Sequence, residues 1–95
     1  MVRHIVAWNL KEGATAQDAR QIKAELEGLM GKIEGLLEMK VHTDLIGTSN
    51  RAIALNSLFA DEAALAHYQA HPEHVRAAAF VGSVTCDRAC IDYHE

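Results

Sequence analysis

The stretch FADEAALAHYQAHPEH, residues 59–74, predicts how the second half of the chain folds. Asp61 is a favoured helix N-cap, and the apolar residues that follow it recur at helical spacing. The residue before a proline is driven out of the helical region, whereas a proline fits the first position of a helix. We therefore expect one helix to end at His71 and another to begin at Pro72.

Around this joint, hydrophobic periodicity predicts four strands and a further helix. Thr15 is placed to cap that helix, with Asp18 three residues on, and Gly31 and Gly35 are expected to close it. Gly82 is expected to cap the helical piece that begins at the proline. The predicted strands cover residues 2–10, 36–43, 52–59 and 88–93.

This order, βαββαβ with a broken second helix, predicts an α+β protein of the ferredoxin-like class. It has a four-stranded antiparallel sheet with its helices on one face, so the other face stays bare. Apolar side chains are expected on both sides of the strands, which favours packing of the bare face on a second copy and hence a homodimer. The residues concerned are Val6, Trp8, Ile53, Leu55, Phe59 and Ile91.

Composition narrows the possible functions of the chain. Its 95 residues predict a single domain over residues 1–95, and the net charge of −4 comes from interspersed charges that favour neither nucleic acid nor a membrane surface. No apolar run approaches the roughly 20 residues that cross a bilayer, and no signal-peptide pattern precedes the first strand. We expect a cytoplasmic protein. Phosphate-binding loops, paired catalytic carboxylates and a Ser-His-Asp order do not appear.

The two cysteines, Cys86 and Cys90, are expected to remain reduced. In an extended segment four residues span about 13 Å, too far for a disulfide. Their CxxxC spacing also differs from the CxxC of redox proteins, so we interpret them as small, half-buried packing residues.

Histidines cluster around the proline, but a metal site there is not expected. His67 and His71 lie four apart on one helix, and His74 follows the break, so the three rings converge only with a fortuitous bend. His74 falls in the first turn of its helix, where the helix dipole disfavours the imidazolium and leaves a neutral base; the Tyr68 phenol could then donate to an enolate oxygen. Alternatively, Tyr68 fills space under the sheet and His74 bonds the backbone. Trp8 is expected in the core or a dimer interface.

Three stretches together, HIVAWNLKEGAT, FADEAALAHYQAHPEH and the closing IDYHE, resemble the stress-responsive A/B barrel domain (Dabb) family over nearly the whole chain. The resemblance implies a dimeric α+β barrel of two ferredoxin-like subunits, in a family whose members mostly have no assigned reaction. Some plant members similar to this chain are polyketide cyclases, which close a poly-β-keto substrate by aldol chemistry without a metal or organic cofactor.

By that resemblance, Tyr68 and His74 match the catalytic tyrosine and histidine of those cyclases. Asp92 matches the aspartate that supports the catalytic histidine, and His4 matches a pocket histidine of the first strand. The third strand departs from the pattern, because Ile53 stands where the cyclases carry a polar pocket residue.

The first and last strands of a ferredoxin-like sheet are antiparallel neighbours, so His4 and Asp92 can share one face. Either His4 or His74 could supply a donor to the carboxylate. The resemblance favours His74, with its tautomer fixed by Asp92 and with His4 lining the same cavity. The alternative is a solvated Asp92 at the chain end.

Three hypotheses for function follow. The chain is a dimer that binds a small hydrophobic or carbonyl-bearing metabolite beside Tyr68 and His74, a cofactor-free cyclase-like enzyme, or a structural dimer without a ligand. The discriminating feature is the space at those two residues, because an apolar cleft favours the first two hypotheses and a filled space favours the third.

Overall fold

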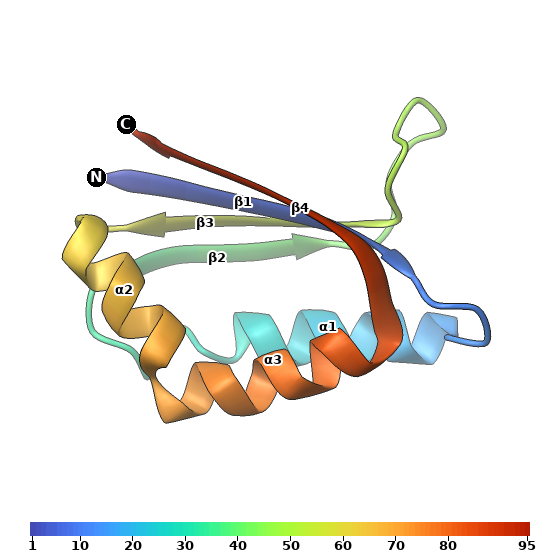
Figure 1. The fold of residues 1–95 in the computed structure, drawn as a ribbon, viewed down its shortest axis with the longest axis horizontal. Helices are drawn as coiled ribbons and strands as arrows, with labels where there is room; N and C mark the ends of the chain where they lie inside the picture. Colours follow the sequence, from blue (N-terminus) through green and yellow to red (C-terminus); the bar gives the residue numbers. More distant parts are fainter.

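The computed structural model describes residues 1–95 and has the expected ferredoxin-like architecture. All three helices lie on one side of a four-stranded antiparallel sheet, and both chain ends lie together at one end of it (Figure 1). The strand order is β2-β3-β1-β4, so the first and last strands are neighbours as predicted. The elements are β1 (Val2–Leu10), α1 (Ala16–Glu27), β2 (Leu36–His42), β3 (Ile53–Phe59), α2 (Glu62–Ala70), α3 (Pro72–Val84) and β4 (Thr85–His94).

Helix α1 starts as predicted and ends early. Asp18 N donates to the Thr15 hydroxyl at 3.2 Å and Thr15 N donates to the Asp18 carboxylate at 2.9 Å, which completes a capping box. The helix stops at Gly28, and the chain then turns through Gly31 and Gly35, whose φ angles are +83° and +88°. These glycines close the connection to β2 rather than the helix, because left-handed backbone favours glycine and cannot continue a right-handed helix.

The joint at Pro72 forms as predicted. His71 is extended, with φ −68° and ψ 134°, and its Nδ1 accepts from Glu73 N at 3.1 Å, so its ring caps α3. The expected cap at Gly82 is wrong, because α3 runs on to Val84. There the Thr85 hydroxyl donates to the Val81 carbonyl oxygen at 2.8 Å and satisfies the last turn.

Strand β4 begins at Thr85, three residues before the predicted start at Arg88. A bulge in the first half of β4 interrupts the alternation of faces from which strands are predicted. At the bulge, Asp87 and Arg88 both lie opposite Trp8. Asp87 adopts a φ of +54°, which a short polar side chain tolerates better than most.

The covered face of the sheet holds the hydrophobic core. Alternate residues of β1, from Val2 to Trp8, point under the helices, and the strand register places His4 opposite Ser57 of β3 and Asp92 of β4. Of the apolar residues expected on both faces, Ile91 alone lies on the open face, opposite Ile5. The others join the core: Val6, Trp8, Ile53, Leu55 and Phe59.

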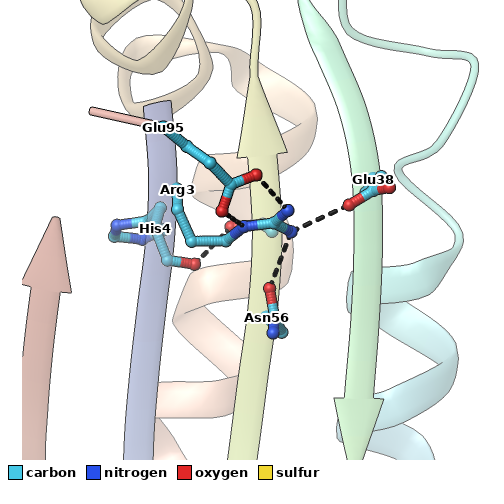
Figure 2. A network of polar contacts seen from close by, with 6 residues as sticks. Arg3, His4, Glu38, Asn56 and Glu95 are labelled. Atoms are coloured by element: carbon cyan, nitrogen blue, oxygen red, sulfur yellow. Dashed lines mark hydrogen bonds and ion pairs between the residues drawn. The ribbon is translucent and has the colours of Figure 1, made fainter. Parts of the chain in front are cut away.

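The open face carries a polar network as well as apolar side chains. Figure 2 shows the Arg3 guanidinium reaching from β1 across β3 toward β2. It donates to Glu38 at 2.8 Å, to Asn56 at 2.9 Å and to both carboxylate oxygens of Glu95 at 2.6 and 3.1 Å. All three nitrogens of the guanidinium therefore donate to an acceptor.

Both cysteines are free, as expected, although Cys90 is exposed rather than half-buried. No helix in the structure has the length and apolar character that crossing a bilayer requires.

Candidate functional site

A cavity of about 180 Å³ lies between the covered face of the sheet and the helices. No acidic residue lines it, and four polar side chains stand in its wall: His4, Tyr68, His74 and Arg88. The remaining wall is apolar and includes Val6, Trp8, Leu26, Leu55, Ala78 and Val81. Trp8 is therefore both a core residue, as expected, and part of the cavity wall.

A larger hollow of about 550 Å³ runs along β2, but its chemistry is less suited to a ligand. Three of its four charged groups, Arg3, Glu27 and Glu38, are already paired within the chain, and only Lys40 is not. Glu38 binds Arg3, and Glu27 accepts both from Lys23 and from the backbone N–H of Val41, at 2.8 and 2.9 Å. We therefore place the candidate site in the smaller cavity.

Tyr68 comes from the last turn of α2 and is only 1% exposed. Its ring packs on Phe59 with centroids 4.8 Å apart, and its hydroxyl has no hydrogen-bond partner in the chain. Since no fully buried side-chain polar atom lacks a partner, this hydroxyl must reach solvent-accessible space, and the space that Tyr68 lines is the cavity. Burial raises the pKa of Tyr68 against the opposing charge of Arg88, so the phenol is a neutral donor.

His4 lies on β1 and is 3% exposed. Its Nδ1 is hydrogen-bonded to the Asp92 carboxylate directly across the strand pair. Because the carboxylate accepts from Nδ1–H, Nε2 of the neutral ring carries the lone pair. Nε2 has no partner, so by the same reasoning it faces the cavity that His4 lines.

The expected pairing of Asp92 with His74 is wrong, because Asp92 binds His4. The cause is strand register, which sets Asp92 opposite His4 on one face. His74 instead donates from Nδ1 to the Gln69 carbonyl oxygen at 3.3 Å. That carbonyl is available because its usual helical donor, Glu73 N, is bound by the ring of His71.

His74 lines the cavity as a neutral imidazole beside Tyr68. The two rings lie 4.2 Å apart between centroids at an angle of 39°. Burial lowers the pKa of His74, the Gln69 carbonyl opposes this, and the charges of His4 and Arg88 lower it further. With Nδ1–H held by Gln69, Nε2 is left as an acceptor.

Arg88 is the site residue that the sequence reasoning missed. The bulge in β4 is secured by Arg51, which donates to the Asp87 carbonyl oxygen at 2.8 Å, and by Asn9, which donates to the Asp87 carboxylate at 3.2 Å. Arg88 lines the cavity and forms no ion pair. A signal was present, because period-two alternation back from Asp92 places Arg88 on the same face.

The histidines around the proline do not form a metal-like cluster. His67 and His71 pack edge to face with centroids 5.5 Å apart. The group whose donor atoms lie within 4.8 Å of one another is His4, Cys90 and Asp92. Its nitrogen, sulfur and oxygen donors are of the kinds that zinc accepts, although the imidazole and carboxylate already bind each other.

Comparisons with known proteins agree with this arrangement. The sequence model of the stress responsive A/B barrel domain matches residues 2–95. The chain belongs to this family. None of the curated proteins compared matches the sequence.

Solved structures similar to this A/B barrel domain chain share its fold. A dimeric ferredoxin-like protein of unknown function from Bacteroides fragilis is 28% identical, with a TM-score of 0.87 over 99% of this chain and 95% of that one. A dimeric ferredoxin-like protein of unknown function from Thermobifida fusca is 24% identical, with a TM-score of 0.89 over 99% and 90%. A hydroxynitrile lyase from Passiflora edulis is 23% identical, with a TM-score of 0.85 over 97% and 90%.

Proposed function

We propose that this A/B barrel domain protein binds a small, mainly apolar molecule that carries a carbonyl oxygen. The observation that supports this most is the Tyr68 hydroxyl, a neutral donor without an internal partner in a cavity whose wall is mainly apolar. A buried polar group normally has a partner, and a carbonyl oxygen supplies one while its apolar body meets the apolar wall. A structural dimer without a ligand would leave both the space and the donor without a purpose.

The test is a titration with acetophenone and with ethylbenzene, which lacks the oxygen. Trp8 is the only tryptophan, so its indole N–H signal in an NMR spectrum reports directly on the cavity. We expect acetophenone to bind more tightly, and Tyr68→Phe to remove a preference of about 3- to 10-fold, as expected for one hydrogen bond. Tyr93→Phe on the open face is the matched control. Equal binding of the two compounds, or no binding, would contradict the proposal.

A second candidate is cofactor-free acid–base chemistry on such a ligand, supported by the Asp92–His4 pair. Nε2 of His4 would remove a proton from the carbon next to the carbonyl, and the C–H electron pair would form the enolate, whose oxygen accepts from Tyr68. In an aldol closure, the enolate carbon attacks a second carbonyl and the alkoxide takes the proton back from His4.

Charge distinguishes this assignment from the sequence-based one, in which His74 is the base. The Asp92 carboxylate lies beside the positive charge that His4 gains on accepting a proton, as in other oriented histidine bases. His74 has no carboxylate partner, and its lowered pKa disfavours a proton there. We therefore assign His74 the role of a neutral wall residue that orders the ligand next to Tyr68.

The experiment is exchange of the methyl protons of acetophenone in D₂O, followed by NMR. We expect His4→Gln and Asp92→Asn each to slow exchange by at least about 100-fold, the lower range for general-base catalysis, while ligand binding persists. His42→Gln, at an exposed position at the end of β2, is the control. Loss of exchange in His74→Gln together with full exchange in His4→Gln would return the base to His74. An exchange rate no higher than that in buffer alone would contradict the acid–base chemistry and support a protein that only binds the ligand.

We also infer that the protein is a homodimer joined through the open face of the sheet. Ile91 is 60% exposed there beside Ile5, and several similar structures are described as dimeric. Light scattering at micromolar concentration should give the dimer mass, and Ile91→Lys should give the monomer mass. A monodisperse wild-type monomer would contradict the dimer. The expected cytoplasmic location stays a prediction, which cell fractionation would check.

A further inference from the structure

Arg88 gives the cavity a charge that no residue of the chain neutralises. It is the only permanently charged side chain in the wall, and no carboxylate lines the cavity. Arginines near a protein surface usually have a carboxylate partner; Arg88 is exposed and has none, and it lies at the edge of a cavity that Tyr68 and His74 also line.

The chain also prevents the acid next to Arg88 in the sequence from serving as that partner. Asp87 precedes Arg88 directly, but its carboxylate accepts from Asn9 and its carbonyl oxygen accepts from Arg51. The bulge thus holds Asp87 outside the cavity, while Arg88 lies on the same face as Cys90 and Asp92 in the regular part of the strand; bulges are common beside binding sites.

From this geometry we propose that the ligand is a carboxylate with a small apolar body, and that Arg88 selects it by pairing with its two oxygens. The inference rests on the proposed ligand-binding function of the same cavity and names its substrate class. A guanidinium matches a carboxylate with two parallel hydrogen bonds, which no other side chain in the wall can offer.

The other polar groups of the wall are compatible with an anion. Tyr68 is a neutral donor, and His74 is a neutral ring, so neither adds a negative charge. The cavity volume of about 180 Å³ equals about six waters at their liquid volume, which limits the body to a single ring or a short chain.

The test compares benzoate with benzamide, which has nearly the same shape and no charge. Binding to the full-length protein is followed at pH 8 by the Trp8 indole N–H signal, in low and high salt. We expect benzoate to bind at least about 10-fold more tightly than benzamide, and Arg88→Gln to abolish that preference by weakening benzoate binding much more than benzamide binding. Arg88→Lys should restore only part of it, because an ammonium cannot form the two-point contact.

Arg20→Gln, an arginine on the exposed side of α1 that contacts only Gln17, is the matched control and should keep the preference for benzoate. Equal binding of benzoate and benzamide to the wild type would overturn the role of Arg88 and leave the neutral-ligand function standing. An equal loss of benzoate and benzamide affinity in Arg88→Gln would mean that the residue shapes the cavity and does not recognise the carboxylate charge. That result would also overturn the proposed role of Arg88. Binding of neither compound would sink the ligand-binding function as well.

Discussion

Arg3 and Arg88 lie on neighbouring strands of one sheet, but on opposite faces and with different partners. Arg3, on the open face, is 15% exposed and contacts Glu38, Asn56 and Glu95 (Figure 2). Arg88, on the opposite face of the edge strand β4, is exposed, has no carboxylate partner and lines a cavity. A cation held by four hydrogen bonds inside the chain stabilises the fold, whereas one without an ion pair beside a cavity is available to a ligand.

The same contrast holds for the aromatic and imidazole groups. Around the cavity under the covered face, Tyr68 has a free hydroxyl, and His4 and His74 each bind an acceptor through Nδ1 and leave Nε2 available. Each ring is thus fixed on one side and free on the other. This combination of a fixed orientation with an unused polar atom marks the covered face as the functional one.

The largest expected effect on stability is the difference between truncating a buried side chain on the covered face and truncating an exposed one on the open face. Phe59 is 0% exposed in the core and Ile91 is 60% exposed on the open face. Phe59→Ala should cost about 3–5 kcal/mol of unfolding free energy, because it leaves a cavity that the core cannot refill. Ile91→Ala should cost no more than about 0.5 kcal/mol in the isolated subunit. Urea unfolding at several protein concentrations measures both, and a concentration-dependent loss in Ile91→Ala would show that a second copy covers the open face.

A smaller effect is expected from separating His4 and Asp92. Asp92→Ala leaves the Nδ1–H of a buried ring without its acceptor, which should cost about 1–3 kcal/mol. Asp44→Ala in the exposed loop after β2 is the control and should change little. Equal stability of the two variants would mean that the His4–Asp92 contact contributes nothing to the fold.

Alkaline titration should distinguish the two tyrosines. Burial raises the pKa of Tyr68, so the unfolded chain loses its tyrosine proton first and stability falls as the pH rises above about 10. The slope from this residue should be at most about 1.4 kcal/mol per pH unit. Tyr68→Phe should remove that part of the loss, and Tyr93→Phe on the open face should not. The same alkaline slope in both variants would contradict a buried neutral Tyr68.

The smallest effect is expected from the Arg3 network. Glu38→Gln removes one exposed partner while Asn56 and Glu95 remain, so the melting temperature should fall only slightly. The difference should vanish in about 1 M salt, where exposed charges are screened. A large loss that persists in high salt would show that the network is covered, as it would be inside a dimer.

Local signals in the sequence were enough to predict the element order and the joint at Pro72. The capping box at Thr15, the extended residue before Pro72 and the alternation of β1 depend on neighbours within a few positions, so they can be read without the rest of the chain. The same alternation was enough to place His4 and Asp92 on one face. Local glycines were less reliable, since Gly82 lies inside α3 and α1 ends before Gly31.

Only the tertiary structure decided which partner Asp92 takes and what lines the cavity. The register of β1 against β4 joins residues that are 88 positions apart, and it pairs Asp92 with His4 rather than with His74. The bulge at Asp87 changes that register next to Arg88, and the packing of the helices on the sheet decides that a cavity lies beside this arginine. Strand register is set by cross-strand hydrogen bonding and core packing, which distant segments create together, so no single stretch of sequence contains it.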